Sequence, residues 1–417
     1  MPRHLLRQID HWRAATHRLR DLEQIAAPAA WRQLESYCGV ALRARLGGTM
    51  RSLQATADGL YHRARSGNER PETLLSEVQS LRRDYLATET TLDYFGDAIN
   101  TRTDARLGRH LTALDHLAGA AMRRALQPLG HLVPPTLTYL DKGLGASILK
   151  AGLRLWDRRG VNPVAVIKVV RHNLYRPTAL IHEAGHQISY QLGWNAELKA
   201  VLARELADQG SRSAAVWAGW SSEIAADAFA FVFTGYAAVA TLQDVLSGGP
   251  GLVFNYHPGA PHPVPYLRAL LGAEMCRLTF GPDGPWNDLA AAWRTRYPLA
   301  EAPAPLARWF AAQERLLPRV ARLVLSHPMR SFGGQSLGAY LPAGHLAPAR
   351  LLRWGAGLGP PAAWTDDQSR ERPLDLLALS VYQQVTESEQ GDYYRRQLDR
   401  WFDRLATLPA TNHSIVS

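Results

Sequence analysis

The stretch Ile181-His-Glu-Ala-Gly-His186 contains a His-Glu-x-x-His signature, and it is the most informative pattern in the chain. Positions four apart lie on one face of a helix, so His182 and His186 can direct two imidazoles at one metal ion. Glu183 then lies about 100° further round the helix, beside the metal. The pattern predicts a metal-binding helix, although two packed or solvated histidines at helical spacing would have the same sequence.

The residues around the signature also predict a helix. Pro177 suits a first helical position, and Gly193 is a typical stop signal. Apolar side chains recur at helical spacing on the side away from the two histidines. They are Leu180, Ile181, Ala184, Ile188 and Leu192. The predicted helix therefore buries one face and leaves the other free for an ion.

A second stretch, residues 220–231, is apolar almost all round and predicts a buried helix. Glu223 and Asp227 are four apart within it, and carboxylates in so apolar a helix are costly unless they are paired or bound to a metal. Glu223 as the third metal ligand, with Asp227 accepting from a ligand imidazole, would account for both. A buried ion pair or a carboxylate at the start of a helix is the alternative.

The two motifs together resemble the gluzincin metallopeptidases, whose pattern is His-Glu-x-x-His followed by Glu-x-x-x-Asp on a second helix. The resemblance implies that His182, His186 and Glu223 hold Zn²⁺. It also implies that Glu183 is the general base and that Asp227 orients a ligand. It covers about residues 135 to 275.

A further element, His262-Pro-Val-Pro-Tyr-Leu-Arg268, is similar to the His-Pro-x-x-x-x-Arg element of the CAAX-prenyl-protease-like branch of this superfamily. In that branch the His and the Arg lie near the active site and help to hold the transition state. His262 is therefore the first candidate donor to an oxyanion, followed by Tyr256 or Tyr236, and Arg268 would position His262 or a nearby carbonyl. That branch is largely membrane-embedded, so this chain is assigned to the superfamily and not to the branch.

The expected fold class is α+β and mostly helical, with a zincin-like catalytic core that contains a small antiparallel sheet. The strands are predicted at residues 136–140, 146–155 and 164–170, and the resemblance implies that an edge strand pairs with the peptide substrate. Three regions are expected. They are an N-terminal helical region over 1–132, the core over 133–275 and a C-terminal helical region over 276–417 that packs on the core.

The helical flanks follow from apolar spacing and from Gly and Pro signals. In the N-terminal region the helices are expected to be antiparallel, with breaks near Gly47-Gly48, Ser66-Gly67 and Asn100-Thr101. In the C-terminal region helices are predicted at about 266–280, 287–296, 304–325, 372–386 and 389–407. These flanks are candidate surfaces for a protein partner.

The chain has 417 residues and a formal charge of +10. Almost all of the positive charge is arginine, and the arginines are scattered along the chain. A nucleic-acid surface would cluster its cations, so nucleic acid is not expected as a partner. DNA binding that persists at physiological salt would contradict this expectation.

Several features predict a cytoplasmic protein without a membrane span. Cys38 and Cys276 form neither a metal motif nor a disulfide framework, so they are expected to be reduced thiols. The N-terminus has no apolar segment of the kind found in secretory signals. The most apolar stretch, residues 224–242, is long enough to span a membrane, but it contains Asp227 and is interpreted as one buried helix.

The expected function is that of a zinc-dependent endopeptidase acting on a protein or peptide substrate. A catalytically silent binding or regulatory protein with the same fold is the alternative, and a different metal-dependent hydrolase is a further one. The intact Glu183 argues against a silent protein, because a structural metal site has no need of a general base.

Overall fold

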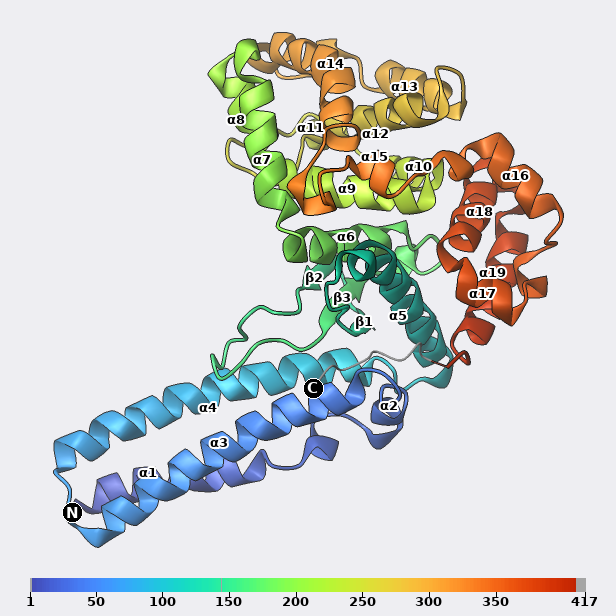
Figure 1. The fold of residues 1–417 in the computed structure, drawn as a ribbon. Helices are drawn as coiled ribbons and strands as arrows, with labels where there is room; N and C mark the ends of the chain where they lie inside the picture. The colour runs from blue at the N-terminus through green and yellow to red at the C-terminus, as the bar shows by residue number, and fades with distance from the viewer. Residues whose placement is uncertain (1, 144, 410–417) are drawn as a thin grey trace.

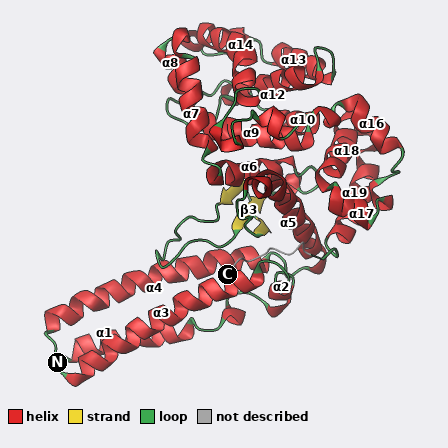
Figure 2. Ribbon diagram, viewed as in Figure 1, coloured by secondary structure: helices red, strands yellow, loops and turns green. Residues whose placement is uncertain are grey.

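The computed structural model describes residues 2–143 and 145–409, and it is mostly helical with one small sheet (Figures 1 and 2). The helices of the N-terminal region are α1 (Arg3–Arg18), α2 (Pro28–Arg32), α3 (Gly39–Ser66), α4 (Pro71–Asn100) and α5 (Ala105–Leu126). Those of the middle region are α6 (Thr178–Gln191), α7 (Trp194–Glu205), α8 (Ser211–Gly219), α9 (Ser221–Thr234), α10 (Tyr236–Leu246), α11 (Pro250–Val253) and α12 (Pro265–Phe280). The remainder are α13 (Pro285–Arg296), α14 (Ala304–Leu325), α15 (Leu337–Tyr340), α16 (Pro348–Ala356), α17 (Asp366–Glu371), α18 (Pro373–Thr386) and α19 (Gly391–Leu405).

The sheet contains β1 (Thr136–Leu140), β2 (Ser147–Leu149) and β3 (Ala165–Val169) in the order β1-β3-β2. β1 is parallel to β3, and β2 is antiparallel to it. The expectation of an antiparallel sheet is therefore wrong, because β3 inserts between the two earlier strands and this pairing order is set by contacts distant in sequence. Strand β2 is also shorter than the predicted 146–155, since the chain leaves the sheet after Leu149.

Helices α1, α3 and α4 form an antiparallel arm that projects from the rest of the molecule (Figure 1). Its distal part has its own apolar cluster, which includes Ile9, Leu53 and Leu81. Helix α3 runs without interruption through Gly47 and Gly48, where a break was predicted. Leu46 and Met50 are buried on either side of this pair, so packing outweighs the low helix propensity of glycine there. The predicted ends at Ser66 and Asn100 are confirmed.

The arm is fastened to the connection between β2 and β3. Arg45 of α3 donates to both oxygens of the buried Asp157 at 2.8 and 3.1 Å. Arg159 donates to Asp84 of α4 at 2.8 Å. These bonds hold residues 150–164 against the arm, and the same segment begins beside α6.

Helix α6 lies at the centre of the main body, between α5 and the sheet on one side and α9 on the other (Figure 1). Its apolar stripe is buried as predicted, with Leu180, Ile181, Ala184 and Ile188 fully inaccessible to solvent. Gly193 follows the helix with a left-handed φ of 68°, which ends α6 where the sequence indicated. One apolar cluster runs from α5 through α6 and α9 to α18 and α19, so the C-terminal helices pack on the core.

The apolar stretch from Ile224 to Leu242 is not one helix. It is divided at Gly235, whose φ of 61° and ψ of −140° separate α9 from α10. Such a conformation is open to glycine and strained for other residues. Each half is buried, and no described helix is long and apolar enough to cross a membrane.

Candidate metal centre

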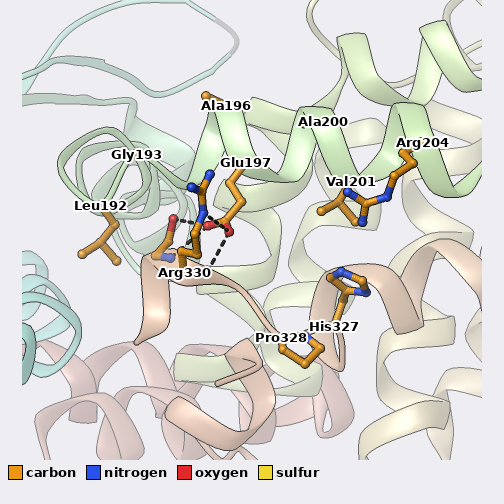
Figure 3. Close-up of a pocket in the computed structure, with 11 residues that line it drawn as sticks. Leu192, Gly193, Ala196, Glu197, Ala200, Val201, Arg204, His327, Pro328 and Arg330 are labelled. Atoms are coloured by element: carbon orange, nitrogen blue, oxygen red, sulfur yellow. Dashed lines mark hydrogen bonds and ion pairs between the residues drawn. The ribbon is translucent and has the colours of Figure 1, made fainter. Parts of the chain in front are cut away.

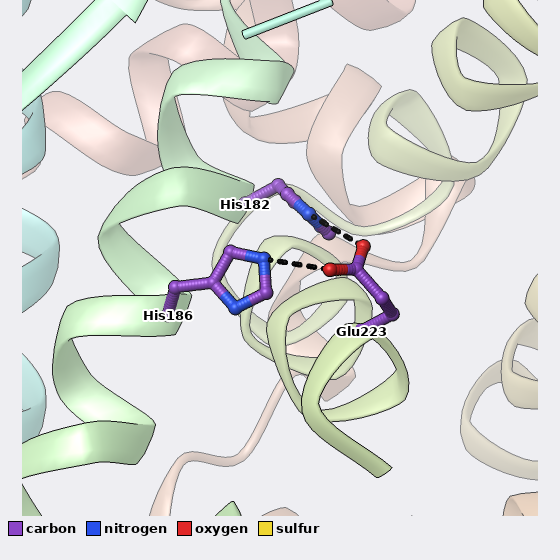
Figure 4. Close-up of side chains that lie close together, drawn as sticks. All are labelled: His182, His186 and Glu223. Atoms are coloured by element: carbon purple, nitrogen blue, oxygen red, sulfur yellow. Dashed lines mark ion pairs between the residues drawn. The ribbon is translucent and has the colours of Figure 1, made fainter. Parts of the chain in front are cut away.

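Three side chains from two helices converge at the contact between α6 and α9 (Figure 4). His182 and His186 extend from the same face of α6, with ring centroids 4.8 Å apart and rings nearly perpendicular. Glu223, in the first turn of α9, places Oε2 3.4 Å from His182 Nε2 and Oε1 3.2 Å from His186 Nε2. One donor atom from each of the three residues lies within 4.8 Å of the others, so this group could hold a metal ion.

The close approach of the two helices depends on Gly185, the fourth residue of the signature. A Cβ at this position would lie 3.0 Å from the carbonyl oxygen of Ala226 and 3.0 Å from Cβ of Phe229, both on α9. Real Cβ atoms are rarely so close to their neighbours, and the nearest atoms here belong to or adjoin the backbone. Gly185 therefore allows α9 to pack against α6 at the level where Glu223 meets the histidines.

The second ring nitrogen of each histidine has its own polar neighbour on α9. Asp227 Oδ1 lies 2.8 Å from His182 Nδ1, the ring nitrogen that faces away from Glu223. This agrees with the predicted role of Asp227 as the acceptor that orients a ligand imidazole. Ser222 Oγ lies 3.4 Å from Nδ1 of His186.

Arg268 lies beside the three convergent residues, but it contacts partners other than His262. Its Nε and Nη2 donate to the two oxygens of Asp227 at 2.7 and 2.8 Å, and Nη2 also lies 3.2 Å from Glu223 Oε2. The residue is only 9% exposed. Because its donors are directed at two carboxylates, Arg268 holds Glu223 and Asp227 in place and does not position His262.

The charges of this group shift its protonation equilibria. Burial lowers the pKa of His182, but the hydrogen bonds that its ring donates to Asp227 and Glu223 outweigh it and raise the pKa to about 10. Burial raises the pKa of Asp227, but Arg268 and His182 bring it down to about 2. Glu223 has a pKa far below its usual range, since the two imidazoles outweigh its burial. A metal ion would have to displace the proton from His182, so binding would release a proton.

Glu183 is 6% exposed and lies next to the two histidines without an ion pair to either. Burial raises the pKa of this carboxyl, and the nearby imidazoles of His182 and His186 offset this only in part. A carboxylate with a raised pKa beside a group that could hold a metal ion is suited to accept a proton near neutral pH.

His262 lies on the exposed side of the group. Its Nε2 is 3.6 Å from Glu223 Oε1, and its side chain is 64% exposed. The two alternative donors lie elsewhere: Tyr256 packs on Trp309, and Tyr236 is buried against Trp286 and Tyr382. Of the three candidates, His262 is the one with a contact to Glu223 among the described residues.

The sequence analysis missed Lys150, Gln187 and Tyr190. Gln187 binds the backbone of Ala151 and thereby holds the end of β2 against α6. Lys150 is close enough to Glu183 and Glu223 for both to act on its pKa, which burial nevertheless lowers. Tyr190 follows His182 and His186 at the same helical spacing, a signal that the sequence did contain.

A separate pocket of about 730 Å³ lies beyond the C-terminal end of α6, between α7 and the segment around His327 (Figure 3). Glu197 in this pocket accepts hydrogen bonds from the backbone N–H groups of Arg330 and Ser331 at 2.7 and 2.9 Å. These bonds fix the segment after α14 to α7. None of the predicted site residues lines this pocket.

In comparisons with known proteins, no family model matches the sequence, and no curated protein or solved structure is significantly similar to it.

Proposed function

We propose that the protein is a zinc-dependent endopeptidase. The observation that carries the proposal is the convergence of His182, His186 and Glu223, with Glu183 beside them. Catalytic zinc sites use three protein ligands at about 2.0–2.2 Å, which in a tetrahedral arrangement places the ligand atoms about 3.4 Å from one another. One donor atom from each of the three residues lies within 4.8 Å of the others, and the two oxygens of Glu223 lie 3.4 and 3.2 Å from the imidazole nitrogens, which supports the proposal.

Each residue of the group has a role in peptide hydrolysis. His182, His186 and Glu223 would hold the ion, which when bound supplies Lewis-acid activation of water and of the scissile carbonyl. Glu183 accepts the proton of the attacking water on its carboxylate and passes it to the leaving amine. Asp227 keeps His182 in the tautomer that presents Nε2, and Arg268 keeps both carboxylates oriented.

Glu183 distinguishes this proposal from a catalytically silent binding protein. A buried carboxylate costs free energy unless it is compensated, and Glu183 forms no ion pair among the described residues. A protein that only bound a metal would gain nothing from keeping this group. A proton acceptor beside the ion is required for hydrolysis.

Metal content tests the ligand set directly. Purified protein is expected to carry about one zinc ion per chain, because three ligands with an open position make a catalytic site. His186→Ala and Glu223→Ala should each lose most of the metal, measured by elemental analysis after gel filtration. His257→Ala, on the exposed loop before α12, is the control and should keep it. Full occupancy in either ligand variant would remove that residue from the set.

The role of His262 is tested by kinetics on a peptide substrate. His262→Ala should lower kcat by about a hundred- to a thousand-fold, as the loss of one oxyanion donor does. KM should change little, because the contact forms mainly in the transition state. Zinc content and folding should remain those of the parent, since His262 is exposed. A variant with nearly normal kcat would show that another group stabilises the oxyanion.

A further inference from the structure

Lys150 is held at a fixed place beside the metal centre. It directly follows the edge strand β2, and its carbonyl oxygen accepts from Asn162 Nδ2 at 3.2 Å. The next residue, Ala151, donates its N–H to Gln187 Oε1 at 2.9 Å and accepts from the same side chain. Gln187 adjoins His186 on α6. The backbone of Lys150 is therefore fastened to the metal-binding helix and to the β2–β3 connection.

The Lys150 side chain reaches Tyr190 of α6, the helix that carries the two histidines. Its Nζ lies 5.8 Å from the centroid of the Tyr190 ring. Tyr190 is 41% exposed and stands one helical turn beyond His186. Gly152, in a turn with φ of 85°, passes close to this ring, since a Cβ there would lie 3.7 Å from it. Lys150 and Tyr190 thus form one wall beside the metal centre, at the free edge of β2.

The ammonium of Lys150 has no carboxylate within ion-pairing distance among the described residues. The negative charges that act on it are those of Glu183 and Glu223. A divalent ion would offset both of these charges, and Asp227 is already paired with Arg268. With the metal in place, Lys150 is a partly buried cation without a counter-ion, which favours an anionic ligand.

We propose that Lys150 and Tyr190 form a subsite that binds a carboxylate of the peptide substrate, so that the enzyme prefers acidic peptides. This inference rests on the proposed peptidase function and specifies its substrate class. The ammonium would bind the carboxylate, and the exposed Tyr190 ring would pack against the aliphatic part of the same residue. The carboxylate can belong to an internal Glu or Asp or to the C-terminus of the peptide, and both sources present the same group.

The test compares matched peptides that contain Glu or Gln near the scissile bond, and the same peptides with a free or an amidated C-terminus. In at least one of these pairs, the peptide with the carboxylate should be cleaved with a kcat/KM about tenfold higher than its neutral counterpart. The difference should lie mostly in KM, as expected for one partly exposed charge-assisted contact. Lys150→Gln should remove the preference, and Lys150→Glu should reverse it toward Lys-containing peptides. Lys142→Gln, an exposed lysine in the loop before β2, is the matched control and should leave it unchanged.

Peptide binding to the Glu183→Gln protein, with and without Lys150→Gln, separates the two proposals. If the parent protein cleaves no peptide but Lys150 still confers tighter binding of Glu peptides, the peptidase proposal fails and the subsite stands. If cleavage occurs and the Glu/Gln ratio is the same with and without Lys150, the subsite is disproved and the peptidase proposal stands. Equal binding of acidic and neutral peptides to the protein that retains Lys150 also overturns the subsite.

Discussion

Replacing Glu183 with Gln should lower kcat on any cleaved peptide by about 10²- to 10⁴-fold while leaving about one zinc ion per chain. Glutamine has nearly the same shape as glutamate but cannot accept the proton of the attacking water. The side chain is not among the three that converge on the metal position, so the ligands stay intact. The measurement is cleavage of a broad peptide library together with zinc content on the same preparations.

A control for this variant is Glu205→Gln, at the end of α7, where the side chain is partly exposed and pairs with Arg204. This change should leave kcat within a factor of two or so, about the scatter expected for a surface substitution. Full activity in Glu183→Gln with zinc retained would exclude Glu183 as the general base. Loss of both zinc and activity would show instead that Glu183 belongs to the ligand set.

The largest effect on stability is expected for Arg268→Met in the metal-free protein. Arg268 is buried and compensates the charges of Asp227 and Glu223. Its removal leaves two poorly solvated carboxylates whose remaining partners are histidines. Breaking a buried pair from one side typically costs about 3–5 kcal/mol. Denaturant unfolding of the metal-free variant should show a loss of free energy of unfolding of that order.

The matched control lies on the same helix. Arg277 of α12 contacts Glu274 and Asn287 near the surface, and Arg277→Met should cost no more than about 1 kcal/mol because solvent screens such pairs. Arg268→Met should also weaken zinc binding by about 10–100-fold, since Asp227 would no longer be held against His182. A stability loss in Arg268→Met equal to that of Arg277→Met would contradict the supporting role assigned to Arg268.

The contacts of Arg268 also change the effects expected of substitutions at His262 and at Arg268. The sequence suggested that Arg268 positions His262 or a nearby carbonyl, and in the first case its loss would have the smaller effect. In the structure Arg268 contacts Asp227 and one oxygen of Glu223, and the exposed His262 lies near the other oxygen of Glu223. The two variants should therefore differ in kind: one lowers stability and metal affinity, and the other lowers kcat.

Local periodicity was sufficient to predict the helices that carry the site. The spacing of Leu180, Ala184 and Ile188 defines the buried face of α6, and it leaves His182 and His186 together on the other side. The same phase argument placed Glu223 and Asp227 on one face of α9. Several C-terminal helices, such as the one predicted at 304–325 and observed as α14 (Ala304–Leu325), follow from the same signals. Such patterns are legible because a helix is built from contacts three and four residues apart.

Contacts between segments distant in sequence decided the rest. The sheet is mixed because β3 pairs with both earlier strands, and no local pattern specifies which strand becomes central. The partners of Arg268 depend on how α12 packs against α9, because Arg268 and Asp227 are 41 residues apart in sequence. Lys150 lies beside the site because Gln187 of α6 hydrogen-bonds to the backbone of Ala151, just after β2. The sequence determined which side chains each helix presents, and tertiary packing determined which of them meet, because pairing across a fold depends on burial and shape that no short stretch contains.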